Sequence, residues 1–257
     1  MIKLTSHLST KLKYLVDKSK EQFSALSQSI TPYHCHFCEA CTDNGSWICK
    51  GCHDDLPWNH HHCKRCALPL NSQFPNLICG DCLSSPPPFD QAICAFRYEL
   101  PINGAIKLLK YDQKRYFATL LTSLLADTIQ THYPNNQLPD VLIPVPIHRS
   151  KRRLRGFNQS YLIAKQLGKT LGIPVDELLL KSSPTPSQAG LNKAQRIRNL
   201  KGSFGLGRRL KPLHVALIDD VMTTQATAEI LSRLLSAAGA KRVDVWCLAR
   251  TAKHHQI

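Results

Sequence analysis

The stretch HVALIDDVMTTQATAEILSRLL, residues 214–235, decides the fold. It opens with a hydrophobic run, His214–Ile218, that is short and apolar enough to be a buried strand. The pair Asp219-Asp220 and a threonine-rich turn follow, and a helical spacing of apolar residues then runs over Thr224–Ala238. The turn offers hydroxyl donors and free N–H groups, and the helix dipole adds positive potential. This order predicts a cradle for a phosphate monoester.

The two carboxylates before the turn complement a phosphate. They can accept hydrogen bonds from vicinal hydroxyls or hold Mg²⁺ through water, so the stretch suits a ribose 5-phosphate. It resembles the signature of type I phosphoribosyltransferases, in which two acids and two variable residues precede Thr-Thr-Gly-x-Thr/Ser. The resemblance implies that Asp219 and Asp220 are the catalytic acids, facing the ribose of phosphoribosyl pyrophosphate (PRPP) with its Mg²⁺. It also implies that the 5-phosphate meets Thr223, Thr224, Gln225, Ala226 and Thr227.

Gln225 departs from that signature, which has Gly at this position. Glycine permits a positive φ and a close backbone approach. Glutamine reaches the left-handed conformation at a cost of roughly 1–2 kcal/mol, and its side chain is long enough to crowd the phosphate. Whether the chain is an active enzyme is therefore left open.

A basic segment follows the predicted strand Val141–Val145. Its cations are Arg149, Lys151, Arg152, Arg153 and Arg155. Backbone amides and arginines after a strand suit a pyrophosphate, so Arg149 and Arg155 join the predicted phosphate-binding residues. The alternative is a solvated basic loop. Gly156 and Phe157 are expected to form a turn, after which Asn158 caps a helix.

Eight cysteines form four C-x-x-C pairs whose first residues are 14, 14 and 16 positions apart: Cys35/Cys38, Cys49/Cys52, Cys63/Cys66 and Cys79/Cys82. Two such turns complete a tetrahedral shell of four thiolates, so the pattern predicts two structural zinc ions. Pairing of consecutive turns is favoured, and an interleaved cross-brace uses the same residues. Because large apolar residues are few, chelation is expected to unfold residues 35–82 and leave the rest folded.

Strand-like and helix-like segments alternate after the polar, proline-rich stretch Ser84–Pro88. Strands are predicted at 93–99, 141–145, 214–218 and 243–248, and helices at 101–111, 115–132, 158–171 and 224–238. Residues 187–201 are expected to be a polar helix or a mobile arm. The fold class is α/β, with a phosphoribosyltransferase-like parallel sheet flanked by helices and a small N-terminal double zinc ribbon. The predicted domains are a helical extension at 1–32, the double zinc ribbon at 33–84 and the phosphoribosyltransferase-like domain at 85–257.

The net charge of +15 favours polyanionic partners, and a hydrophobic content of 43% excludes wholesale disorder. No apolar run approaches the roughly 18 residues that span a bilayer, and the first residues lack the features of a secretory signal. We therefore expect a cytoplasmic protein. A leucine stripe beside basic residues in 1–32 predicts an amphipathic helix, which packs on protein or associates peripherally with the inner face of the membrane.

Further motifs match one family. They are PVP at 144–146, RGFNQS at 155–160, VWCLART at 245–251 and the spaced residues Gln188, Leu191, Arg196, Asn199 and Phe204. With the four cysteine pairs, residues 33–251 resemble the ComF/GntX family of competence and DNA-utilisation proteins. The resemblance implies handling of single-stranded DNA after its entry into the cell, for natural transformation or nutrition. The implied partners are single-stranded DNA, DNA-uptake or recombination machinery, and PRPP or a related ligand.

Two functions compete at this point. The first is a DNA-handling competence factor with a phosphoribosyl-binding site. The second is an active PRPP-dependent phosphoribosyltransferase of nucleotide metabolism. A scaffold that recruits other proteins through its ribbons is a third class.

Overall fold

The computed structural model describes residues 33–42, 45–71, 77–111, 114–133, 137–181, 203–207, 211 and 213–253. The chain divides into two compact units, Met1–Asp55 and Leu56–Ile257. The predicted helix within 1–32 and the predicted arm at 187–201 lie outside the described residues. The domain boundaries expected at 32/33 and 84/85 stay predictions.

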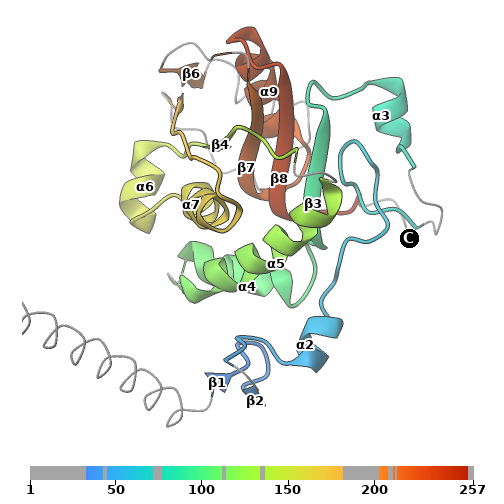
Figure 1. The fold of residues 1–257 in the computed structure, drawn as a ribbon, viewed down its shortest axis with the longest axis vertical. Helices are drawn as coiled ribbons and strands as arrows, with labels where there is room; N and C mark the ends of the chain where they lie inside the picture. The colour runs from blue at the N-terminus through green and yellow to red at the C-terminus, as the bar shows by residue number, and fades with distance from the viewer. Residues whose placement is uncertain are drawn as a thin grey trace, which may run out of the picture. The chain divides into compact units, whose positions relative to one another are not determined.

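The described part of the first unit is small and built around the first two cysteine pairs (Figure 1). Strand β1 (Tyr33–His34) pairs antiparallel with β2 (Cys41–Thr42), and helix α2 (Lys50–Asp54) follows. Cys49 caps this helix, because its sulfur accepts a hydrogen bond from the backbone N–H of Cys52. The backbone thus folds around the sulfur atoms.

The second unit contains a four-stranded parallel sheet in the order β3-β8-β7-β4. Its strands are β3 (Gln91–Arg97), β4 (Val141–Pro144), β7 (His214–Met222) and β8 (Arg242–Arg250). Most of their residues are buried in near-continuous runs, as expected for parallel strands that are covered on both faces. The predicted α/β class with a parallel sheet is confirmed.

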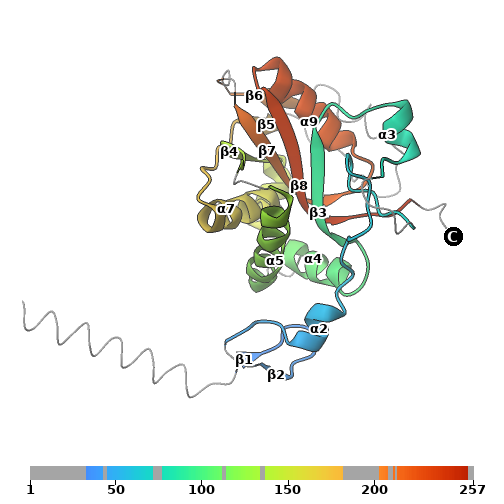
Figure 2. The same cartoon turned by 45° about the vertical axis from the view of Figure 1, so that its right-hand side comes forward.

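Helices cover both faces of this sheet (Figure 2). Helix α5 (Tyr116–His132) and helix α7 (Gln159–Leu171) pack on one face, and α4 (Ile102–Tyr111) packs against α5. Helix α9 (Ala226–Ala237) lies on the other face, against β7 and β8. None of the helices within the described ranges has the length and hydrophobicity to cross a bilayer.

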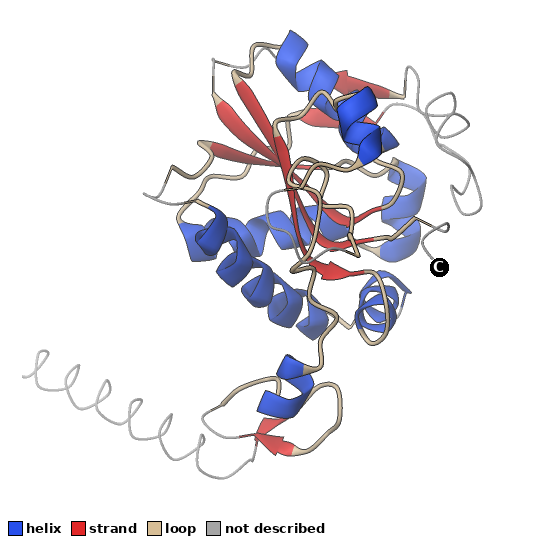
Figure 3. Cartoon of the chain, turned by 90° about the vertical axis from the view of Figure 1, so that its right-hand side faces the viewer, coloured by secondary structure: helices blue, strands red, loops and turns tan. Residues whose placement is uncertain are grey.

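The third and fourth cysteine pairs belong to the same compact unit as the sheet. Helix α3 (Gly80–Ser84) carries Cys82, the last of these four cysteines. It is the one helix among the described residues from 56 to 84, and loops make up most of the rest of this segment (Figure 3). The four cysteines share one hydrophobic core with Leu217, Val245 and Leu231. The backbone N–H of Ala92 donates to the carbonyl of Arg65 at 2.9 Å, which joins this ribbon to β3. The ribbon is therefore part of the sheet's core.

Three segments differ from the sequence predictions. The basic segment after β4 is a helix, α6 (Arg149–Arg155), rather than a loop. The His148 ring caps its start, and Gly156, at φ 78°, ends it. Strand β7 extends past Ile218 to Met222, so both acids lie on the strand itself. A short antiparallel pair, β5 (Leu179–Lys181) with β6 (Phe204–Leu206), was not predicted.

Candidate sugar-phosphate site and metal centres

The predicted phosphate loop joins β7 to α9 at the carboxyl edge of the sheet. The turn spans Thr223–Gln225, and the helix begins at Ala226 instead of the predicted Thr224. Gln225 adopts the left-handed conformation, with φ 67° and ψ −8°. Its carbonyl accepts the first helical hydrogen bond, from the N–H of Glu229 at 2.8 Å. The backbone therefore keeps the geometry that glycine usually provides, although the residue is glutamine.

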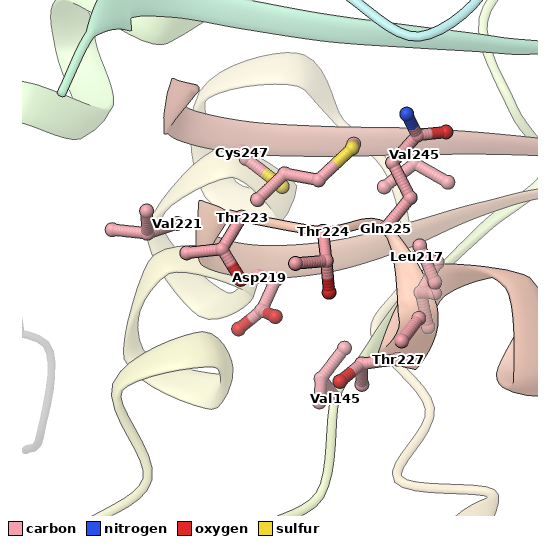
Figure 4. Close-up of a pocket in the computed structure, with 13 residues that line it drawn as sticks. Val145, Leu217, Asp219, Val221, Thr223, Thr224, Gln225, Thr227, Val245 and Cys247 are labelled. Atoms are coloured by element: carbon pink, nitrogen blue, oxygen red, sulfur yellow. The ribbon is translucent and has the colours of Figure 1, made fainter. Parts of the chain in front are cut away.

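A pocket lies against this loop (Figure 4). Its polar side is formed by Asp219 and by the loop residues Thr223, Thr224, Gln225, Ala226 and Thr227. Figure 4 shows the Asp219 carboxylate and the hydroxyls of Thr224 and Thr227 on one side of the loop. The amide of Gln225 points in the opposite direction, so this side chain leaves the side with the hydroxyls open.

Asp219 is held by two hydrogen bonds to the same oxygen. The Ser160 hydroxyl donates to Oδ1 at 2.9 Å, and the backbone N–H of Asp220 donates to it at 2.9 Å. Burial, with the neighbouring charge of Asp220, raises the pKa of Asp219 to about 7. Asp219 therefore changes its protonation state near neutral pH. The ionised form is the one that would accept hydrogen bonds from ribose hydroxyls.

Asp220 is turned toward a different partner. The Nζ of Lys110, on α4, lies 3.0 Å from its Oδ2, and both side chains are largely shielded from solvent. Burial acts against the charge of Lys110, but the ion pair and hydrogen bond with Asp220, together with the charge of Asp219, outweigh it and raise the pKa of this lysine. Neither Lys110 nor Ser160 was singled out as a site residue from the sequence. Ser160 lay within the quoted RGFNQS motif, whereas Lys110 carried no local signal.

Helix α6 places a row of cations at the same edge of the sheet. It follows β4, whose neighbour in the sheet is β7. The side chain of Asn158, which comes shortly after α6, donates to the carbonyl of Val145, the residue after β4, at 3.0 Å. Asn158 also caps α7 as predicted, since its Oδ1 accepts from the N–H of Ser160. Arg149 is exposed on α6, and Arg155 donates to Gln159 at 3.2 Å. Arg149 and Arg155 are not among the residues that line the pocket.

Aromatic rings accompany these cations. The guanidinium of Arg155 lies 5.3 Å from the ring centroid of Tyr111, and that of Arg115 lies 5.0 Å from the ring of Phe157. Tyr111 is 67% exposed. Burial and the charge of Lys151, on α6, lower the pKa of Lys181 to about 8. Positive charge is thus concentrated on and around α6.

The eight predicted metal ligands form two groups, each with its thiols within 4.8 Å of one another. One group is Cys35, Cys38, Cys49 and Cys52, and the other is Cys63, Cys66, Cys79 and Cys82. The consecutive pairing is therefore the one observed, and the interleaved cross-brace is not.

The thiol geometry fits zinc. A tetrahedron with Zn–S bonds of about 2.3 Å has S–S edges of roughly 3.8 Å. The sulfurs of Cys38 and Cys49 are 3.7 Å apart, as are those of Cys66 and Cys79. A hydrogen bond with the Cys66 thiol, together with backbone N–H groups, lowers the pKa of Cys63 to about 4, which favours a thiolate ligand. Bound zinc would tie the turns of each group together.

Fold and site together define the class of this protein. It is an α/β protein in which an acidic pair and a threonine turn lie at the carboxyl edge of a parallel sheet, with two tetrathiolate groups N-terminal to that sheet. A family model described as a double zinc ribbon domain matches residues 26–95.

Named relatives align with most of this chain. It is 33% identical to DNA utilization protein YhgH of Escherichia coli over 224 residues, covering 86% of this chain and 98% of the relative. It is 32% identical to competence protein F of Haemophilus influenzae over 211 residues, covering 79% of this chain and 90% of the relative. The chain belongs to the family of DNA utilization protein YhgH and competence protein F.

Solved structures give a weaker comparison. A purine phosphoribosyltransferase from Pyrococcus horikoshii is 22% identical, with a TM-score of 0.31, covering 51% of this chain and 69% of that chain. An adenine phosphoribosyltransferase from Leishmania tarentolae is 17% identical, with a TM-score of 0.33, covering 56% of this chain and 74% of that chain. TM-scores of this size are too low to bear on function.

Proposed function

We propose that this protein handles single-stranded DNA in the cytoplasm during DNA uptake or utilisation, and that its threonine loop binds a phosphoribosyl group. One observation carries the proposal. The cationic helix α6, with its neighbouring cation–π pairs, lies at the same sheet edge as the Asp219 carboxylate and the loop. Lysine and arginine neutralise backbone phosphates, and aromatic rings stack on unpaired bases. The names of the relatives agree with a role in DNA utilisation.

The chemistry of α6 favours nucleic acid over a general basic surface. Five of its seven residues are cationic and none is acidic, so its charge is not balanced within the helix. Tyr111 and Leu154 are 67% and 84% exposed beside these cations, which provides apolar surface for bases. Exposed aromatic and cationic groups in alternation are the composition that single-strand sites use.

The test is the binding of a fluorescent single-stranded oligonucleotide, measured by anisotropy across a salt series. The double variant Arg152→Ala/Arg153→Ala removes two exposed charges from α6. The matched control, Lys165→Ala/Lys169→Ala, removes two exposed charges from α7. We expect the α6 variant to weaken binding and to reduce the salt slope by about one for each phosphate that is no longer neutralised. Absence of binding at low salt, or equal effects of both variants, would refute the proposal.

The ligand of the pocket is proposed to be PRPP with Mg²⁺, or a related sugar phosphate. Asp219 would accept from the ribose hydroxyls, and the hydroxyls of Thr224 and Thr227 would meet the 5-phosphate. Magnesium would be held through water beside the acid pair, as carboxylates commonly hold it. Isothermal calorimetry with PRPP and Mg²⁺ on the wild type, Asp220→Asn and Gln225→Gly tests this, and failure of all three to bind removes the ligand.

A second candidate function is an active PRPP-dependent phosphoribosyltransferase. It is favoured by the acid pair on β7 and by Lys110, which holds Asp220 in place. The reaction would release pyrophosphate from C1 of the sugar, and the cations of α6 would stabilise the leaving group. Release of pyrophosphate in the presence of a nucleobase, absent in Asp220→Asn, is the decisive measurement.

Two further partners, other proteins of DNA uptake or recombination and the membrane, are also proposed. DNA-uptake or recombination proteins would bind to the zinc ribbons or to the basic surface of α6. Peripheral association with the inner face of the membrane would involve residues 1–32. Vesicle co-sedimentation of the full chain, with and without anionic lipid, tests the membrane contact.

A further inference from the structure

Arg250, the last residue of β8, connects two parts of the second unit. Its side chain is buried, with 3% of the residue exposed. The Nε atom donates to the carbonyl of Cys66 at 3.1 Å. The Nη1 atom donates to the carbonyl of Met222 at 3.0 Å and also to that of Thr223. One guanidinium therefore joins a metal-ligand turn to the first residue of the phosphate loop.

Backbone hydrogen bonds hold the residues next to this guanidinium in place. Met222 and Arg250 face each other in the register of β7 and β8. The N–H of Thr251 donates to the carbonyl of Met222 at 3.1 Å, and the N–H of Tyr98 donates to the carbonyl of Arg250 at 2.8 Å. A planar, five-donor group held this way has little freedom to move without losing a partner.

The position of the Cys66 carbonyl, which accepts from Arg250, depends on the second cysteine group. Cys66 is one of its four thiols, and the turn that supplies the carbonyl is the C-x-x-C turn itself. The Asn59 side chain donates to the carbonyl of Ala67 at 2.9 Å, which holds the next residue of the same turn. Bound metal fixes the Cys66 sulfur, and the adjacent carbonyl is fixed with it.

We propose that Arg250 is a positioning residue for the phosphate loop, and that through it metal binding at Cys63, Cys66, Cys79 and Cys82 is coupled to ligand binding at the loop. This rests on the proposed binding of a sugar phosphate there. A buried guanidinium that loses a carbonyl partner carries a large desolvation penalty, so Arg250 follows the Cys66 carbonyl. The carbonyls of Met222 and Thr223 move with it, and they set the direction of the loop N–H groups.

The coupling is reciprocal, as every linkage between two binding sites must be. Ligand at the loop changes the environment of the second metal site, and a change in that site alters ligand affinity. The first cysteine group lies in the other compact unit, whereas the hydrogen bonds of Arg250 described here go to Cys66, Met222 and Thr223, all in the second unit. The two metal sites are therefore expected to differ in their response to ligand.

The experiment uses the full chain carrying Cys35→Ser and Cys38→Ser, so that one tetrathiolate site remains, loaded with Co²⁺. Cobalt in a tetrathiolate site has visible absorption bands that report its geometry. Ribose 5-phosphate is the probe, and its affinity is measured by calorimetry on the zinc form. In this background we expect the probe to shift the cobalt bands.

Two further variants separate positioning from general stability. Arg250→Lys keeps the charge but cannot span the three carbonyls, so we expect affinity for ribose 5-phosphate to fall by about fivefold or more, with no shift of the cobalt bands. Lys253→Ala is the matched control. Its Nζ lies 2.5 Å from Asp81 on α3, so its ion pair is with the segment that carries Cys79 and Cys82. We expect both readouts to remain as in the parent.

The outcomes are distinguishable. Binding of ribose 5-phosphate with unchanged cobalt bands in the parent overturns the coupling and leaves the proposed ligand standing. An unchanged affinity in folded, metal-loaded Arg250→Lys overturns the positioning role. Failure of the parent to bind the probe at all overturns both proposals. If Arg250→Lys does not fold, the parent and Lys253→Ala spectra still decide the coupling.

Discussion

Lys110 and Asp220 form an ion pair beside the candidate pocket, with Nζ 3.0 Å from Oδ2. The pair leaves Asp219 as the carboxylate that lines the pocket, and Lys110 also helps to keep Asp219 ionised. A lysine on α4 therefore lowers the pKa of an acid on β7, against the larger opposing effects of burial and of the Asp220 charge.

Replacement of this lysine is expected to change that pKa. In Lys110→Met the positive charge is lost, so the pKa of Asp219 rises above its value of about 7. Carboxyl-carbon NMR titration measures the change. Lys107→Met is the control, because Lys107 lies exposed on the same helix. An Asp219 titration that is the same in both variants contradicts the role given to Lys110.

The raised pKa of Asp219 predicts a pH dependence of stability. Asp219 keeps its proton to about pH 7 in the folded protein but releases it near pH 4 when unfolded. Between these values the unfolded chain binds fewer protons, so this group lowers folding stability as the pH rises.

The variant Asp219→Asn removes that contribution. We expect it to be more stable than the wild type at neutral pH, with a difference that grows from pH 4 to 7 and then levels off. Urea unfolding at several pH values measures it. Asp127→Asn, at an exposed position on α5, should show no such trend. A pH-independent difference for Asp219→Asn would count against the raised pKa.

The left-handed conformation of Gln225 makes a separate stability prediction. Glycine adopts a φ of 67° without a steric penalty, so Gln225→Gly should raise the free energy of unfolding by about 1 kcal/mol. Gln225→Ala keeps the β-carbon and should gain nothing. Chemical denaturation compares the three proteins, and equal stability of the Gly and Ala variants would contradict the strained geometry.

Two helical glycines form a matched pair. A β-carbon on Gly168, in α7, would lie 2.6 Å from the backbone oxygen of Ile173, whereas one on Gly104, in α4, has its nearest contact at 3.9 Å. We expect Gly168→Ala to destabilise the protein by about 1–3 kcal/mol and Gly104→Ala to be neutral or slightly stabilising. Thermal unfolding of both variants is the measurement; a destabilised Gly104→Ala with a tolerated Gly168→Ala would overturn the packing described for α7.

Metal loss is expected to affect the two cysteine groups differently. The second group shares its core with the sheet, so Cys66→Ser should lower the melting temperature of the second unit by about 5 °C or more. Cys38→Ser lies in the first unit and should leave that transition in place. Calorimetric scans and limited proteolysis distinguish the two. This revises the expectation from sequence that chelation spares everything after residue 82.

Helix α6 shows where sequence patterns stop being informative. The segment RSKRRLR contains one apolar residue, so it has no amphipathic period from which a helix could be predicted. Its ends are set by the His148 cap and by Gly156 in the left-handed conformation. The strands and the larger helices were predictable, because long apolar runs and helical stripes reflect burial against the sheet.

The sequence by itself determined the features that are local along the chain. The four C-x-x-C turns and the strand, acid pair and threonine turn each fold within about ten residues, so their spacing carries their chemistry. Only the tertiary structure decided which distant residues meet them. Lys110, Ser160 and Arg250 reach the acids and the loop because parallel strands bring their carboxyl ends to one edge. The second cysteine group lies in the sheet's core for a related reason: its own few apolar residues need that surface to be buried.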